Sequence, residues 1–158
     1  MKTIGWIGTW VMGQGMVNNL LNAWYKVLVF NRTIEKTKGL VEAWAVLSSS
    51  IAELTKNCDI VVTIIGTPKD VEQVYFGNNW IYENIREWQF VVDMTTTSPS
   101  LSVKIYDKFK EKWVSALDAP VSWWDVWAKT WNLAIMVWWD EETYNEIFPI
   151  FDIMGWNV

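Results

Sequence analysis

The first thirteen residues constrain the fold more than any other segment. An apolar stretch, Lys2–Ile7, leads into a turn with glycine at Gly8 and Gly13, and a helical pattern follows. A strand, a glycine-rich turn and a helix in this order are typical of the first unit of a dinucleotide-binding domain, with the turn pattern G-x-G-x-x-G. The middle glycine lets the backbone approach a pyrophosphate, and here it is Trp10. The segment predicts the fold, whereas Trp10 argues against close phosphate contact.

Apolar strands alternate with helical segments along the rest of the chain. Strands are expected at Lys2–Ile7, Lys26–Phe30, Ala45–Leu47, Asp59–Ile65, Gln89–Asp93, Val114–Leu117 and Asn132–Val137. Helices are expected at Gly13–Ala23 and Thr33–Ala43, from Ser50 and Thr67, from Ser98 to Lys112, and from Asp140 to Gly155 with a bend at Pro149. This alternation predicts an α/β fold, a Rossmann-like doubly wound and mostly parallel sheet, with residues 1–158 as one dinucleotide-binding domain.

Ligands bind such sheets at the carboxyl ends of the strands. The loops expected there are Gly8–Gly13, Asn31–Thr33, Ile65–Asp70, Asp93–Pro99 and Ala119–Trp124. Arg32 follows the second strand, where NAD sites usually place an acidic residue on the ribose 2′-hydroxyl and an arginine instead accommodates a 2′-phosphate. We therefore expect NADP(H) to be preferred over NAD(H), and a surface arginine beside a helix cap is the alternative.

Composition excludes several classes of function. Eighteen acidic and 13 basic residues give a net charge of −5, so nucleic acid is not expected as a partner. The absence of histidine removes His-based zinc sites and Ser-His-Asp triads, and no metal site is expected. Cys58 is the only cysteine, which fits a cytoplasmic protein and a packed small residue. No secretory signal or run of 18 apolar residues occurs, so no membrane span is expected.

Fourteen of the 158 residues are tryptophan, and they follow neither a helical nor a strand period. Several follow helical segments or precede strands: Trp24, Trp44, Trp80, Trp88 and Trp113. Helix ends and turns of this kind are where glycine supplies a positive φ. We therefore expect positive φ at these tryptophans.

Four motifs carry a resemblance to a known family: Gly8–Gly13, Phe30–Thr33, Asp93–Pro99 and Leu117–Ser122. Their order and spacing resemble the β-hydroxyacid dehydrogenases over the whole chain, a family that includes 3-hydroxyisobutyrate dehydrogenase and tartronate semialdehyde reductase. The related 6-phosphogluconate dehydrogenases fit less well, because the Asp-Ala-Pro-Val-Ser stretch belongs to the β-hydroxyacid branch. The resemblance implies an oxidoreductase that transfers hydride between a nicotinamide and a 3-hydroxy acid or its semialdehyde, within a homo-oligomeric parent enzyme.

The resemblance also implies the site residues. The Gly8–Gly13 turn would hold the pyrophosphate, the loop after the second strand would meet the ribose and its 2′-phosphate, and Thr96 would lie near the nicotinamide. The implied cofactor-binding residues are Gly8, Thr9, Trp10, Val11, Met12, Gly13, Asn31, Arg32, Thr33, Ile65, Gly66, Asp70 and Thr96. Ser122, Trp123 and Trp124 would bind the substrate carboxylate. For Ser122 the alternative is a loop hydroxyl that bonds to local backbone.

The chain departs from the family pattern in two ways. Twelve tryptophans stand where glycine is expected: Trp10, Trp24, Trp44, Trp80, Trp88, Trp113, Trp123, Trp124, Trp127, Trp131, Trp138 and Trp139. The family's catalytic lysine lies on a helix of a C-terminal domain, which would follow Val158. No catalytic residue is therefore expected in this chain, and the chain alone is expected to be inactive.

Two other hypotheses are compatible with the sequence. The chain could be a non-catalytic scaffold that no longer binds cofactor, with glycine replaced by tryptophan on purpose or through miscoding. A non-glycine residue in the left-handed region costs roughly 1–2 kcal/mol. The other hypothesis is an aromatic-rich module that binds sugar rings or a partner protein, for which a contiguous stripe of exposed tryptophans would be required.

Overall fold

The computed structural model describes residues 1–122, 133–138 and 140–158. Its strands are β1 (Ile4–Ile7), β2 (Val27–Phe30), β3 (Val46–Leu47), β4 (Ile60–Thr63), β5 (Phe90–Asp93) and β6 (Ser115–Asp118). They pair in parallel in the order β3-β2-β1-β4-β5-β6. The strand order reverses between β1 and β4, as in doubly wound dinucleotide-binding folds. The predicted Rossmann-like parallel sheet is thus confirmed.

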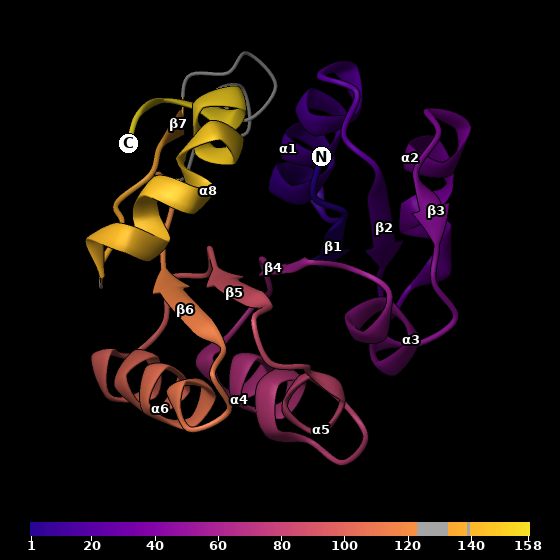
Figure 1. The fold of residues 1–158 in the computed structure, drawn as a ribbon. Coiled ribbons are helices and arrows are strands. Elements are labelled where there is room, and N and C mark those ends of the chain that lie inside the picture. The colour runs from indigo at the N-terminus through magenta and orange to yellow at the C-terminus, as the bar shows by residue number, and fades with distance from the viewer. Residues whose placement is uncertain (123–132, 139) are drawn as a thin grey trace.

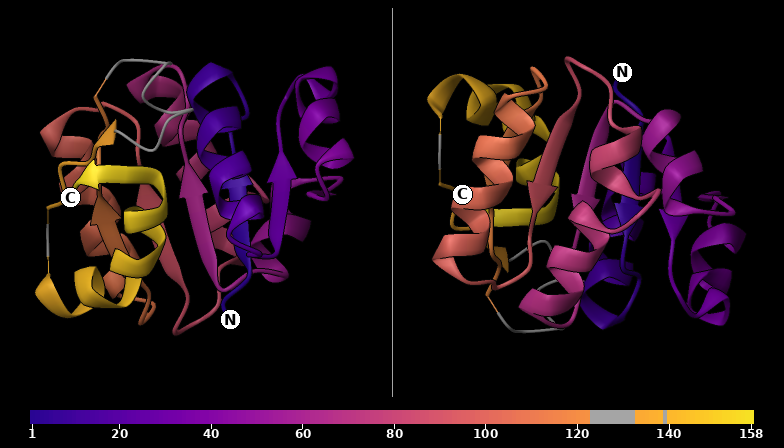
Figure 2. Two further views of the ribbon diagram at one scale, coloured as in Figure 1. Left: turned by 90° about the horizontal axis from the view of Figure 1, so that it is seen from above. Right: turned by 90° about the horizontal axis from the view of Figure 1, so that it is seen from below.

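Helices cover both faces of the sheet (Figure 1). One layer contains α1 (Val11–Asn22) and α8 (Glu141–Met154), and the other contains α3 (Ile51–Lys56), α4 (Pro68–Phe76), α5 (Ile81–Asn84) and α6 (Pro99–Lys110). Views from above and below show the strands side by side between these layers (Figure 2). Each face has its own buried apolar cluster, one around Trp6, Met16 and Phe151 and the other around Leu54, Tyr75 and Phe109. Burial of these clusters is the main force that holds the three layers together.

The helix starts follow the predicted capping residues. The Ser50 hydroxyl accepts from the Glu53 N–H, and the Thr67 hydroxyl accepts from the Asp70 N–H. Asp140 accepts from two backbone N–H groups at the start of α8, which continues through Pro149 to Met154. Each cap satisfies N–H groups that have no partner within the helix.

Some elements differ from their predicted bounds. The segment 33–43 divides into a 3₁₀ helix η1 (Ile34–Thr37) and a short helix α2 (Lys38–Glu42), and α1 begins at Val11 rather than Gly13. The strand expected at 132–137 is reduced to β7 (Leu133–Ala134) in the described residues, and it pairs with β8 (Gly155–Asn157). Neither α5 nor β8 was predicted, because four and three residues are too few to establish a period.

The positive φ expected at five turn tryptophans is observed at all but one of them. Trp24, Trp44, Trp88 and Trp113 have φ between 58° and 78°. The expectation is wrong for Trp80, whose φ is −110° at the start of α5, and the left-handed residue there is its neighbour Asn79, with φ 60°. Asparagine is one of the few residues that tolerate this conformation without glycine's freedom.

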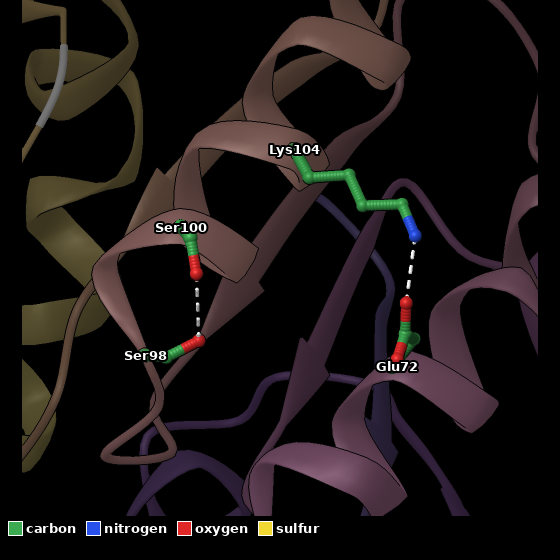
Figure 3. Close-up of polar contacts among 4 residues, drawn as sticks. All are labelled: Glu72, Ser98, Ser100 and Lys104. Atoms are coloured by element: carbon green, nitrogen blue, oxygen red, sulfur yellow. Dashed lines mark hydrogen bonds and ion pairs between the residues drawn. The ribbon is translucent and has the colours of Figure 1, made fainter.

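Surface pairing between helices is modest. The Lys104 ammonium of α6 contacts the Glu72 carboxylate of α4 at 2.7 Å, and the Ser98 and Ser100 hydroxyls lie 3.3 Å apart at the start of α6 (Figure 3). An exposed ion pair of this kind contributes about 0–1 kcal/mol.

Within the described part of the chain, no helix is long and apolar enough to cross a membrane.

Candidate functional site

The turn between β1 and α1 requires glycine at two positions. Gly8 has φ +98°, and a Cβ added there would lie 2.0 Å from the Ile64 carbonyl oxygen. A Cβ added to Gly13 would lie 2.2 Å from the Gly8 carbonyl oxygen. The buried Trp6 indole donates its Nε1–H to that same oxygen at 3.0 Å. These contacts fix the conformation of the turn. The hydrogen bond from Trp6 also gives the large side chain at position 6 a structural role.

Trp10 occupies the middle position of this turn. Its backbone is extended, with φ −80° and ψ −175°, so the main-chain conformation itself does not call for glycine. Its side chain is 67% exposed, and the Lys36 ammonium lies 5.5 Å from the ring centroid. The indole therefore stands at the opening of the turn, where a phosphate would need to approach the backbone.

The loop after β2 is tied to this turn. The Thr9 N–H donates to the Asn31 side-chain oxygen at 3.1 Å, and the Asn31 amide donates to the Thr33 carbonyl at 2.9 Å. The Thr9 hydroxyl donates to the Lys36 carbonyl at 3.3 Å. Two loops that are more than 20 residues apart are thereby held as one surface, beside the exposed Arg32.

These loops border a groove of about 880 Å³ at the carboxyl edge of the sheet. Twelve of the thirteen predicted cofactor residues line it: Gly8, Trp10, Val11, Met12, Gly13, Asn31, Arg32, Thr33, Ile65, Gly66, Asp70 and Thr96. The exception is Thr9, which is fully buried and acts through the hydrogen bonds described above. The size is within the usual range for a ligand or cofactor site.

Other lining residues were not predicted: Lys36, Ser49, Ser50, Gln73, Asn78, Asn79 and Trp80. Lys36 lies on η1. Its position four residues after Arg32 in the sequence is the signal that indicates a second positive charge at the groove. Gln73 lies on α4, and the others come from the loops after β3 and α4, whose approach to the groove depends on how β3, α4 and α5 pack.

A buried polar network supports the groove from below. Asp93, at the end of β5, accepts hydrogen bonds from the Thr63 hydroxyl at 2.8 Å and the Thr95 N–H at 3.1 Å. Thr63 also contacts the Tyr75 hydroxyl at 2.9 Å. The Thr95 hydroxyl accepts from the Ile65 N–H at 3.0 Å, so the network joins the loops after β4 and β5.

Burial controls the acidity of this network. It raises the pKa of Asp93 from 3.8 to about 6, and the hydrogen bonds from Thr95 and Thr63 oppose the shift. Burial also raises the pKa of the neighbouring Asp118. One oxygen of each carboxylate has no hydrogen-bond partner among the described residues. Desolvation without full compensation is the cause of both shifts.

Asp70 and Ser122 have clear local partners. The Thr67 hydroxyl donates to the Asp70 carboxylate at 2.6 Å, which completes the cap of α4 at the groove's rim. The Ser122 hydroxyl accepts a hydrogen bond from the Ala134 N–H at 3.2 Å. This contact agrees with the alternative given from the sequence, a loop hydroxyl that bonds to local backbone. Ser122 does not line the groove, and the predicted substrate residues Trp123 and Trp124 lie outside the described residues.

Two other chemistries find little support in the described residues. Cys58 is buried, and burial raises the pKa of its thiol to about 12, so it is a packed residue rather than a nucleophile. No group of three or more acidic, cysteine or histidine residues that could hold a metal occurs in the part of the chain that the structure describes. The groove and its glycine turn are the features that remain.

Comparison with known proteins identifies the family. The sequence pattern of the NAD binding domain of 6-phosphogluconate dehydrogenase matches residues 3–158. The chain belongs to this family of NAD-binding domains. Its relatives are oxidoreductases of the 3-hydroxyisobutyrate dehydrogenase type, which confirms the branch that the sequence motifs indicated.

Three similar proteins illustrate the relationship. An uncharacterized oxidoreductase, YkwC of Bacillus subtilis, is 45% identical over 99% of this chain and 54% of its own length. A probable 3-hydroxyisobutyrate dehydrogenase-like mitochondrial protein of Arabidopsis thaliana is 40% identical over 96% of this chain and 46% of its own. The structure of 3-hydroxyisobutyrate dehydrogenase from Mycobacterium tuberculosis with L-serine superimposes with a TM-score of 0.93 at 26% identity, covering 99% of this chain and 53% of that one. The chain spans about half the length of the relatives it matches.

The residues of this NAD-binding domain fit a dinucleotide except at one position. Gly8 and Gly13 provide the close backbone packing that the turn needs, and Arg32 and Lys36 supply positive charge at the groove. Trp10 disagrees with the pattern, because its exposed indole projects from the residue whose backbone would approach the pyrophosphate. The disagreement is confined to one side chain in an otherwise matching turn.

Proposed function

We propose that the chain is the NADP(H)-binding domain of an oxidoreductase that transfers hydride between a nicotinamide and a 3-hydroxy acid or its semialdehyde. One observation carries this proposal. The Gly8–Gly13 turn, Arg32 and Thr96 come from three different strand ends and line one groove at the point where the strand order reverses. This is the place where doubly wound folds bind dinucleotides.

The adenosine end of the cofactor would meet the loop after β2. Asn31 is held by hydrogen bonds to Thr9 and Thr33, so this loop has a fixed shape. Arg32 is exposed there and available to a 2′-phosphate, and Lys36 lines the same groove. Two cations beside a ribose site favour NADP(H) over NAD(H) because the additional phosphate is anionic.

The nicotinamide end would meet the loop after β5. Thr96 is exposed on the groove, and the buried hydrogen bonds of Asp93 and Thr95 fix the residues just before it. The nicotinamide, when bound, supplies the hydride chemistry, and the domain positions its ring and excludes alternative orientations.

Substrate and proton transfer would involve residues near and beyond this domain. The names of the relatives support a small hydroxy acid as substrate. Ser122, with Trp123 and Trp124, is proposed to bind the substrate carboxylate. On the family resemblance, we propose that the proton-donating lysine belongs to a helical C-terminal domain of a homo-oligomeric parent enzyme. Turnover would then need that domain together with residues 1–158. A single buried cysteine is consistent with a reducing cytoplasm.

The test is a titration with NADPH and NADH, followed by energy transfer from tryptophan to the reduced nicotinamide. The Trp10→Gly variant is expected to bind NADPH at least tenfold more tightly than the unchanged chain, because it restores close approach of the pyrophosphate. Trp24→Gly, on the far edge of the sheet, is the matched control and should not change affinity.

Cofactor choice is tested in the same background. Adding Arg32→Asp to Trp10→Gly should abolish or reverse the preference for NADPH, because a carboxylate suits a ribose 2′-hydroxyl and repels a phosphate. Equal affinities for NADPH and NADH before and after this change would reject Arg32 as the phosphate-binding residue. Failure of Trp10→Gly to bind either dinucleotide would reject the proposed function itself.

A further inference from the structure

Left-handed backbone positions in this chain are occupied in an unusual way. Among the described residues, positive φ occurs at Gly8, Asn79 and four tryptophans, Trp24, Trp44, Trp88 and Trp113. Bulky side chains in this region are outliers, since their Cβ approaches the neighbouring carbonyl. Yet only one of the chain's eight glycines adopts it. Tryptophan holds the positions for which glycine is suited.

Three of the four tryptophans occupy the same hydrogen-bonded motif. At the end of α1, the Trp24 N–H donates to the Leu21 carbonyl at 3.0 Å, and the Tyr25 N–H donates to the Leu20 carbonyl at 3.0 Å. This pair of bonds defines the Schellman motif, in which the left-handed residue is usually glycine. The same pair recurs at Trp44 and Ala45 after α2, with Val41 and Leu40 as acceptors, and at Trp113 and Val114 after α6, with Lys110 and Phe109 as acceptors.

The fourth tryptophan lies in a tight turn. The Gln89 N–H donates to the Arg86 carbonyl at 3.4 Å, and Trp88 is the third residue of this four-residue turn with φ 68°. Positive φ at the third position alone is typical of a type II turn, which requires glycine or asparagine there. Four separate sites therefore share one backbone requirement.

The contacts of these four indoles give no structural reason for tryptophan at these positions. Their exposed fractions are 87% at Trp24, 90% at Trp44, 73% at Trp88 and 70% at Trp113, and the only aromatic contact described among them joins Trp88 to Trp113 at 6.2 Å between centroids. Trp6 is the contrast, because it is fully buried and donates a hydrogen bond. A partner surface could use exposed indoles, but no partner requires a left-handed backbone, so the conformation favours a different explanation.

We propose that the protein made by its own organism carries glycine at positions 24, 44, 88 and 113, and also at position 10. Such a pattern arises when one codon specifies glycine in that organism and tryptophan under another genetic code. At position 10 the inference rests on the proposed function, because there the need for glycine comes from the pyrophosphate and not from φ. Glycine at position 10 completes the G-x-G-x-x-G turn between Gly8 and Gly13.

The direct test is peptide mass spectrometry of the protein isolated from its natural source. Peptides that contain residues 10, 24, 44, 88 and 113 should have the masses expected for glycine. Tryptophan at any of the four left-handed positions overturns the inference, and the exposed indoles then become candidates for a contact surface.

A second test separates backbone from side chain in the recombinant chain. Trp24→Gly should lower the unfolding equilibrium constant by about 5- to 30-fold, because it removes the left-handed strain. Trp24→Ala removes the indole but keeps the strain, so it should leave the constant nearly unchanged. Trp138→Gly is the matched control, since Trp138 is half-exposed without a positive φ, and it should give no stabilisation. An equal gain from Trp24→Ala, or no gain from Trp24→Gly, contradicts the proposal.

The native peptide masses and the NADPH affinity of the Trp10→Gly chain are independent measurements. Glycine in the native peptides, combined with a Trp10→Gly chain that does not bind NADPH, supports glycine at these sites and rejects the dinucleotide function. Tryptophan in the native peptides of a protein that binds NADPH overturns the glycine assignment and leaves the function in place.

Discussion

At the carboxyl edge of the sheet, the left-handed position after β1 is occupied by Gly8, whereas the left-handed positions just before β2, β3, β5 and β6 carry tryptophan. Because the strands are parallel, these tryptophans all lie at the opposite edge. The difference is steric. A Cβ at Gly8 would lie 2.0 Å from a backbone oxygen, whereas the tryptophan side chains extend into solvent and carry only the torsional penalty. The comparison separates two reasons for glycine, close approach and backbone conformation.

The largest effect should come from relieving all four torsional penalties. The quadruple variant with glycine at Trp24, Trp44, Trp88 and Trp113 should raise the free energy of unfolding by about 4–8 kcal/mol, at about 1–2 kcal/mol per site. Urea denaturation at fixed pH measures the change. Trp88 and Trp113 are in contact, so their double variant is measured separately, because effects in contact need not add. A quadruple variant no more stable than the single ones would remove the torsional explanation.

The opposite edge should respond in the opposite direction. Gly8→Ala should destabilise the chain by about 2–5 kcal/mol, since it combines an overpacked contact with the Ile64 carbonyl and a strained φ. The same denaturation measurement applies. A Gly8→Ala chain with unchanged stability would mean that the turn relaxes freely, and the steric half of the comparison would fail.

The sequence predicts the parts of the fold that depend on local interactions better than the parts that depend on contacts between distant residues. Alternating apolar strands and capping residues such as Ser50, Thr67 and Asp140 act locally, and they correctly indicate the parallel sheet and its helix starts. The pairing of β7 with β8 joins residues that are about 20 positions apart, and short elements of this kind carry no period of their own. Their existence depends on tertiary packing.

The candidate site divides in the same way. The glycine turn and Arg32 were predictable because each follows a strand end, and strand ends of a parallel sheet meet at one edge. Lys36 was missed because a 3₁₀ turn, rather than the expected helix, places it on the groove. The Asp93 network was also missed, since its partners Thr63 and Tyr75 belong to other elements and their hydrogen bonds follow from burial.

Asp93 provides a pH-dependent test at the carboxyl edge. Its folded pKa of about 6 exceeds the ordinary 3.8, so its contribution to stability is fully present below about pH 4 and decreases as pH rises through 6. The total decrease is about 3 kcal/mol, at 1.36 kcal/mol per pKa unit. Asp93→Asn does not titrate and should lack this slope. The difference between the two unfolding free energies, measured from pH 4 to 7, checks the sign, and a difference that grows in favour of the aspartate with rising pH would contradict it.

The smallest expected effect comes from Gly39, a glycine that neither adopts a positive φ nor allows a close approach of another group. Gly39 lies within α2, has no positive φ, and a Cβ added there would meet nothing within 4 Å. The same helix ends in the left-handed Trp44, so glycine stands where alanine would be better and tryptophan stands where glycine would be better. Gly39→Ala should stabilise the chain by about 0.5–1 kcal/mol, because alanine loses less backbone entropy in a helix. Trp44→Ala is the matched control on the same helix and should give no comparable gain, since alanine at position 44 keeps the strained φ. Equal stabilisation by both alanines would show that the chain does not distinguish helical from left-handed positions, and the torsional side of the comparison would be wrong.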